Sequence, residues 1–204
     1  MNVEIHDYAK RLESITRRTR EASNISPQNK ELIEKFKNDC FAYNIGAARI
    51  VRYMYALRDL AVWLEKDFDI STIDDIKMLI AKVEQMSKYS PRTKYEYRAT
   101  IKKFYKWLKN KDEPEEVSWI DLRKKIHNDK LPSELLSEDN IIAMVNATKN
   151  PRDRAMIISL YESGCRIGEF LKVRIKELIF ESPGCLFFVH GKTGGRRIRV
   201  ISSE

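Results

Sequence analysis

The stretch Ser90–Leu108, SPRTKYEYRATIKKFYKWL, decides the fold class of this chain. A serine in the N-cap position precedes a proline at the first helical position, where the missing N–H costs nothing. The apolar side chains that follow recur at the three- and four-residue spacing of a helix that packs on a core: Tyr97, Ile101, Phe104 and Leu108. The stretch therefore predicts a long amphipathic helix and a mainly α-helical protein.

Three helices of the same kind are expected before this one. The first opens at Ser26-Pro27, the second near Gly46, and the third at Ser71 or Thr72, each followed by an apolar stripe at helical spacing. A weaker stripe near the N-terminus adds one more. The second helix matches the helix quoted above at a shift of 44 residues, which either an internal repeat or convergence between amphipathic helices explains. We expect a bundle of four to five helices over residues 1–112.

The second half of the chain has a different character. Residues 113–133 are polar, contain prolines and lack periodicity, which is typical of a linker, with a short helix expected around Ile120 to Ile126. Residues 134–204 predict the start of an α+β domain.

Helices and a β-hairpin are expected in this α+β domain. Ser137 and Asn150 cap two helices, and Gly164 ends the second. The apolar residues expected to face inward in these helices are Ile141, Met144, Val145, Met156, Ile157, Leu160 and Tyr161. After Phe180 the period changes to two, so residues 186–190 and 197–201 are expected to form a small antiparallel β-hairpin.

Positive charge is concentrated in one element. The formal net charge of the 204-residue chain is +8, and residues 88–111 carry nine basic residues and one acid, which is the same +8. Because solvated helix faces normally alternate in sign, this helix favours a polyanionic partner, and double-stranded DNA is the expected one. Lys94, Arg98, Lys102 and Lys106 stand four residues apart and are expected to form one continuous stripe for phosphates. The expected DNA-binding residues are Arg92, Lys94, Arg98, Lys102, Lys103, Lys106, Arg196 and Arg197.

Several functional classes are excluded by the sequence. No apolar run approaches the roughly 20 residues of a membrane span, so no membrane partner is expected. The three cysteines form no CxxC pair, so neither a metal site nor a disulfide framework is expected, and the reducing cytoplasm is the expected location. The turn at Gly191-Lys192-Thr193 does not fit a nucleotide-binding P-loop, because Leu186 stands where the first glycine is needed and no helix follows. No cofactor or nucleotide is expected.

Two further features carry chemistry. In residues 160–171, LYESGCRIGEFL, a helix ends at Gly164, Arg166 follows at the corner, and Glu169 stands three residues later. An arginine at such a corner can present its fork to a phosphate while the carboxylate orients it; a surface ion pair between the two is the alternative. The second feature is Lys192 at the tip of the hairpin, with Arg196 close behind, which can reach into a DNA groove.

Together these features resemble the tyrosine recombinase family of phage integrases and Xer-type recombinases, most closely its archaeal branch. The helix that starts Ser90-Pro91-Arg92-Thr93 is similar to part of the family's SAM-like helical core-binding domain. Residues 150–171 resemble the family's first catalytic motif, and Gly191-Lys192-Thr193-Gly194-Gly195 resembles its lysine hairpin. The resemblance implies a core-binding domain over 1–112, an interdomain linker over 113–133, and the N-terminal part of a catalytic domain over 134–204.

The resemblance also implies roles for three residues. Arg166 would clamp the scissile phosphate and stabilise charge in the pentavalent transition state. Glu169 would support the site, and Lys192 would protonate the leaving 5′-oxygen as a general acid. This chemistry needs no metal or nucleotide, and it implies duplex DNA as the partner, with self-association on the DNA.

The chain departs from the family pattern in one respect. The family also uses a downstream HxxR motif, a further His or Trp, and a tyrosine nucleophile. Within the 204 residues no histidine has an arginine three positions on, and the last tyrosine, Tyr161, precedes Arg166. We therefore interpret the chain as the DNA-binding front portion of a recombinase, truncated before its nucleophile. Two alternatives stay open: a non-catalytic DNA-binding regulator that keeps the fold, and a helical module whose basic face meets an acidic protein.

The 204-residue chain should bind DNA without forming a covalent adduct. Neither Arg166 nor Lys192 can replace a tyrosine oxygen as nucleophile, because an arginine clamps the phosphate and a lysine donates a proton. The test is incubation with a nicked duplex followed by a denaturing gel. A protein–DNA band that survives denaturation would show that the nucleophile lies among the tyrosines upstream.

Overall fold

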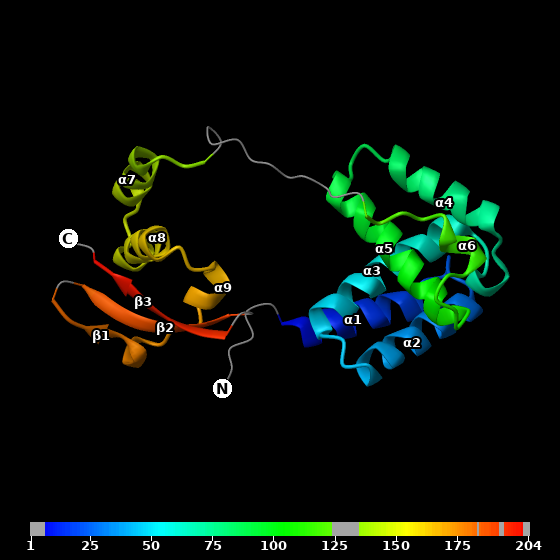
Figure 1. Ribbon diagram of the computed structural model, residues 1–204, viewed down its shortest axis with the longest axis horizontal. Helices are drawn as coiled ribbons and strands as arrows, with labels where there is room; N and C mark the ends of the chain where they lie inside the picture. Colours follow the sequence, from blue (N-terminus) through cyan, green and yellow to red (C-terminus); the bar gives the residue numbers. More distant parts are fainter. Residues whose placement is uncertain (1–6, 124–134, 183, 192–193, 202–204) are drawn as a thin grey trace. The chain divides into compact units, whose positions relative to one another are not determined.

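The structure is a computed structural model that describes residues 7–123, 135–182, 184–191 and 194–201 (Figure 1). The described residues divide into two compact units, 7–123 and 135–201. The first unit contains helices alone among its described residues, whereas the second combines helices with a small sheet.

The first unit is a bundle of five long helices and two short ones. The long helices are α1 (Tyr8–Glu21), α2 (Pro27–Ala42), α3 (Ala47–Leu64), α4 (Ile73–Gln85) and α5 (Pro91–Leu108); the short ones are the 3-10 helix η1 (Phe68–Ile70) and the single turn α6 (Glu115–Ser118). The predicted caps are confirmed, since Ser26, Thr72 and Ser90 each accept a hydrogen bond from the backbone N–H three residues on. α3 and α5 are both 18 residues long, and their bounds differ by the 44 residues of the sequence match.

α5 contributes an aromatic centre to the core of this unit. Phe104 is fully buried, and its ring lies 5.3 Å from the ring of Phe36 and 4.9 Å from that of Phe68. Tyr105 is buried beside it and donates its hydroxyl hydrogen to the Phe68 carbonyl at 2.9 Å, so its polar end is satisfied. The prediction that α5 buries one apolar face is therefore confirmed.

The packed core of the first unit extends beyond residue 112, where the sequence predicts the linker to begin. Val117 and Ile120 are buried, because α6 packs on α4 and α5. A short helix lies at Glu115–Ser118, and residues 120–123 are not helical. The rest of the helix expected around Ile120 to Ile126 lies outside the described residues. The rest of the expected linker, from 124 to 133, lies outside the described residues.

The second unit combines three α-helices with a three-stranded antiparallel sheet. Its elements are α7 (Glu138–Ala147), α8 (Pro151–Ser163), α9 (Ile167–Phe170), the 3-10 helix η3 (Ile175–Glu177), β1 (Ile179–Phe180), β2 (Cys185–Gly191) and β3 (Gly194–Val200). The sheet order is β1-β2-β3. The predicted hairpin is confirmed as β2 and β3, whereas β1 escaped prediction because two residues are too short to show alternation.

The core of the second unit is small. It consists of Cys165, Phe187, Val189, Ile198 and Val200, with α8 in contact with β3 and α9 in contact with β2. The prediction that Met144 and Tyr161 face inward is wrong, since they are 44% and 50% exposed. The physical reason is that α7 packs mainly on α8, so the apolar stripes of both helices are only partly covered by the described residues.

Replacing Phe104 with alanine should destabilise the first unit by about 3–5 kcal/mol, the usual cost of removing a buried phenylalanine ring. Met78→Ala on α4 is the control, because Met78 is 66% exposed and its loss should change the free energy of unfolding by less than about 0.5 kcal/mol. Urea unfolding followed by far-UV circular dichroism measures both. Equal effects of the two substitutions would contradict the packing described above.

Candidate nucleic-acid interface

The corner between α8 and α9 positions Arg166 and Glu169. Gly164 ends α8 in the left-handed conformation with φ of 55°, which glycine adopts without strain, and Arg166 then stands at the N-cap of α9. The Glu169 carboxylate accepts the Arg166 backbone N–H at 3.2 Å and a guanidinium hydrogen from Arg166 Nη1 at 2.8 Å. The predicted Arg166–Glu169 pair is thus formed by one local turn.

Glu169 also reaches the β-hairpin. Its second oxygen accepts a hydrogen bond from Arg196 Nη2 of β3 at 2.8 Å, and only 6% of its side chain is exposed. At Gly191, the last residue of β2, a β-carbon would lie 2.0 Å from Glu169 Oε1. The carboxylate therefore lies against the hairpin backbone, directly beside the position that precedes Lys192. Lys192 itself lies outside the described residues.

Hydrogen bonds keep Glu169 ionised. Those from the Arg166 side chain and backbone, with the positive charge of Arg196 nearby, hold the pKa of the Glu169 carboxyl below its ordinary value. Because the folded pKa is lowered, the stabilisation from this group is present above the unfolded pKa of about 4.3 and is lost as pH falls through the folded pKa. At neutral pH the cluster carries two positive charges and one negative charge.

Strand alternation separates two arginines that the sequence grouped together. Arg196 lies on the same face of β3 as the buried Ile198 and Val200, which is why it meets Glu169. Arg197 lies on the opposite face, with its guanidinium carbon 5.2 Å from the ring centre of Phe188. Arg196 therefore belongs with Arg166, and Arg197 does not.

The four-residue basic stripe expected on α5 is not uniform. Each step of four residues turns about 40° beyond a full circle, so the stripe drifts from the edge of the buried face outward. Lys94 donates to the Glu84 carbonyl, and the Arg98 guanidinium lies 3.5 Å from the Glu84 carboxylate. Lys102 donates to the Ile120 carbonyl at 2.7 Å. These three cations therefore contact neighbouring elements of the bundle, and their binding to phosphates stays a prediction.

Three other basic residues of α5 form no hydrogen bond or ion pair with the described residues of α4 or of the segment after α6. Lys103 is exposed and Lys106 half-buried, and neither forms a hydrogen bond or ion pair with any residue that the structure describes. Arg92 is 66% exposed on its side chain and pairs with Glu96 at 2.8 Å. Arg92, Lys103 and Lys106, which we call the outward cations, are therefore the candidate phosphate contacts of the first unit.

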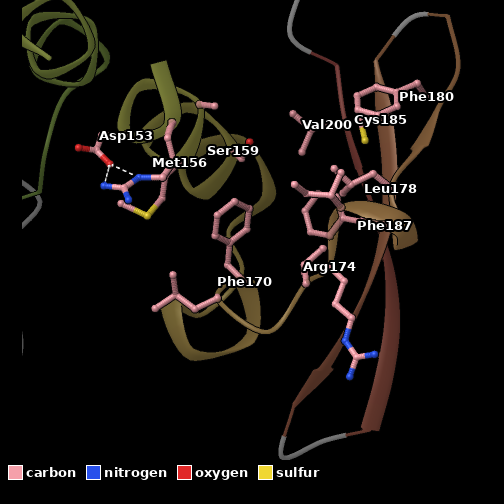
Figure 2. A pocket seen from close by; sticks show the side chains of 15 residues that line it. Asp153, Met156, Ser159, Phe170, Arg174, Leu178, Phe180, Cys185, Phe187 and Val200 are labelled. Carbon is pink, nitrogen blue, oxygen red and sulfur yellow. Dashed lines mark hydrogen bonds and ion pairs between the residues drawn. The ribbon is translucent and has the colours of Figure 1, made fainter. Parts of the chain in front are cut away.

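A hollow with a mostly apolar lining lies beside α9. It measures about 750 Å³ and lies between α8 and the sheet (Figure 2). Phe170 and Phe187 point toward each other across it, with ring centres 6.1 Å apart, and Arg152 at its edge is paired with Asp153 at 2.7 Å. Its mostly apolar lining suits apolar side chains rather than a phosphate.

Two other features are absent from the described part of the chain. No group of three His, Cys, Asp or Glu side chains there is placed to hold a metal ion. Within the same residues, every helix is too short or too polar to cross a bilayer.

No protein-family model matches the chain. It is 27% identical to the tyrosine recombinase XerA of Pyrococcus horikoshii over 176 residues, 85% of this chain and 56% of that protein. It is 25% identical to the tyrosine recombinase XerA of Saccharolobus solfataricus over 190 residues, 87% of this chain and 62% of that protein. Over most of its length the chain is thus similar to two archaeal tyrosine recombinases.

Solved structures share the fold of this chain. Two are of a XerH site-specific recombinase, one bound to its difH substrate before cleavage and one bound to palindromic difH after cleavage. They superpose with TM-scores of 0.56 and 0.57 at 18% identity and cover 95% of this chain. These likenesses support a mainly helical fold with a small antiparallel sheet. The chain spans only 56 and 62% of the two curated relatives' lengths.

Sequence reasoning missed two features of the Arg166–Glu169 site. It grouped Arg196 with Arg197, although the alternation Arg196, Ile198, Val200 was a signal that Arg196 shares the apolar face. It read Gly191 as part of a turn, whereas this glycine leaves room for the Glu169 carboxylate. No local pattern could have revealed the second feature, because α9 and β2 are brought together only by the fold.

Gly191→Ala should push the Glu169 carboxylate away from Arg166 and Arg196, since a side-chain end moves more easily than a strand. The pKa of Glu169 should then rise toward its ordinary value. The variant should therefore lose less stability on acidification than the unaltered chain, because the stabilisation from the lowered pKa is already missing at neutral pH. Carbon-13 NMR titration of the carboxyl, together with thermal unfolding at several pH values, measures both effects.

Gly168→Ala is the control for this substitution. A β-carbon at Gly168 of α9 meets no described atom within 4 Å. Both measurements should therefore match the unaltered chain. An unchanged Glu169 pKa in the Gly191→Ala variant would contradict the close approach of hairpin and carboxylate.

Proposed function

We propose that this part of a tyrosine recombinase holds duplex DNA by its phosphates and carries the phosphate-clamping half of a strand-exchange site. In this proposal Arg166 binds the phosphate at which a strand is cut, Glu169 holds Arg166 in position, and Lys192 donates a proton to the leaving 5′-oxygen. The observation that carries the proposal is the buried Glu169 carboxylate, which joins Arg166, Arg196 and the β2 residue next to Lys192.

The chemistry follows from what each group can do. An arginine fork donates two parallel hydrogen bonds to phosphate oxygens and compensates the charge that grows on them in a pentavalent transition state. A lysine beside it supplies a proton to the oxygen that leaves. A carboxylate that accepts a hydrogen bond from the arginine fixes the guanidinium before the phosphate arrives. Little conformational entropy is therefore lost when the phosphate binds.

The outward cations of α5 supply the sequence-independent part of the proposed grip. Each phosphate that they neutralise releases condensed counterions, and this release favours binding to any duplex. The XerH structures carry DNA substrates, which agrees with this partner for the family. Self-association on DNA and strand cleavage with rejoining stay predictions from the resemblance, and a cytoplasmic location stays a prediction from the cysteine pattern.

Salt dependence tests the proposed grip. With about five or six phosphate contacts, log K for a short fluorescein-labelled duplex should fall with log salt at a slope near −5. The variant Lys103→Ala/Lys106→Ala should lower the magnitude of this slope by about 1.8, because two phosphate contacts are lost. Fluorescence anisotropy at several salt concentrations measures the slopes.

The matched control removes two cations from the same helix. Lys94→Ala/Arg98→Ala should lower the unfolding temperature, since both side chains bind Glu84, and should change the slope less. A slope near zero for the unaltered chain would overturn the DNA proposal. Equally tight binding to polyglutamate would favour the alternative of an acidic protein partner.

A further inference from the structure

Two arginines share one buried carboxylate in the second unit. Arg166 donates to one oxygen of Glu169 and Arg196 donates to the other, both at 2.8 Å. A buried carboxylate needs one cation to compensate its charge, and the first arginine supplies it. The second arginine therefore leaves a surplus positive charge that a purely structural ion pair does not require.

Both guanidinium groups keep donors for a ligand. A guanidinium has five N–H donors, and Glu169 accepts one from each arginine side chain. The side chains of Arg166 and Arg196 are 66% and 47% exposed, whereas that of Glu169 is 6% exposed. The carboxylate thus lies beneath two forks that stay open to solvent.

We propose that Arg166 and Arg196 bind one and the same DNA phosphate, with Glu169 as the spacer that holds their forks apart. This inference rests on the proposed function and adds Arg196 to the phosphate site itself. A phosphodiester carries a single negative charge, so it neutralises the surplus charge of the cluster. Without Glu169 the two like charges would repel each other, and the pair would not be preformed.

The other arginines of β3 have partners other than Glu169. Arg197 lies over the Phe188 ring on the opposite strand face, and Arg199 forms an ion pair with Glu181. Arg199 is 49% exposed, close to the 47% of Arg196, and it stands on the same strand. It is therefore a matched control for the loss of one exposed arginine from β3.

The test is a double-mutant comparison of duplex binding by the 204-residue chain, with a short fluorescein-labelled duplex as the probe. Arg166→Ala and Arg196→Ala should each weaken binding about tenfold, the usual loss for a hydrogen bond to a charged group. If both bind one phosphate, the double variant should lower the magnitude of the salt slope by about 0.9 in total. Two separate phosphates would lower it by about 1.8, and that result would overturn the inference.

Further variants separate phosphate binding from folding. Arg199→Ala should leave affinity and slope unchanged. Arg196→Lys keeps the charge beside Glu169 but lacks the fork, so it should weaken binding while leaving the unfolding temperature unchanged. Full affinity in this variant would also overturn the inference.

Duplex binding by the unaltered chain distinguishes failure of the proposed function from failure of this inference. If it does not bind the duplex at all, the proposed function fails, and this inference fails with it. If it binds but Arg196→Ala binds equally well, this inference alone fails.

Discussion

A carboxylate can accept hydrogen bonds from two arginines at once because its two oxygens point in different directions. Glu169 uses one oxygen for Arg166 and the other for Arg196, while its position against Gly191 leaves no room for a side chain there. Burying a carboxylate is costly unless such partners are present. The single turn α9, the end of β2 and the middle of β3 must therefore come together at one point, and the geometry of the second unit depends on it.

The two units are stabilised in different ways. The bundle buries a large apolar cluster around Phe104, which positions α5 mainly by apolar packing. The second unit buries five residues in its core and leaves α7 and α8 partly uncovered among the described residues. Because the apolar contribution of this small core is limited, the ionic cluster at Glu169 carries more of the local order there.

Several cations of α5 and its C-terminal end donate to backbone carbonyls of neighbouring elements. Lys94 donates to a carbonyl in the last turn of α4, Lys109 to the Asp69 carbonyl of η1, and Lys102 to the Ile120 carbonyl just after α6. Helix C-termini leave carbonyls without partners and carry partial negative charge, so lysines from a neighbouring helix are suited to them. The same helix therefore both caps its neighbours and presents the outward cations to solvent. A net charge alone does not distinguish these two uses.

The sequence by itself determined the elements of this protein and the identity of its chemical groups. Caps at Ser26, Thr72 and Ser90, the glycine at 164 and the change of period after Phe180 are local signals, because each depends on neighbours within one turn or one strand. The Arg166–Glu169 pair lies within one turn and was predicted for the same reason. Only the tertiary structure decided which cations of α5 are bound by neighbouring helices, that Val117 and Ile120 are buried, that Met144 and Tyr161 are exposed, and that Arg196 meets Glu169. These outcomes depend on what lies opposite a side chain, and residues far apart in the sequence supply that partner.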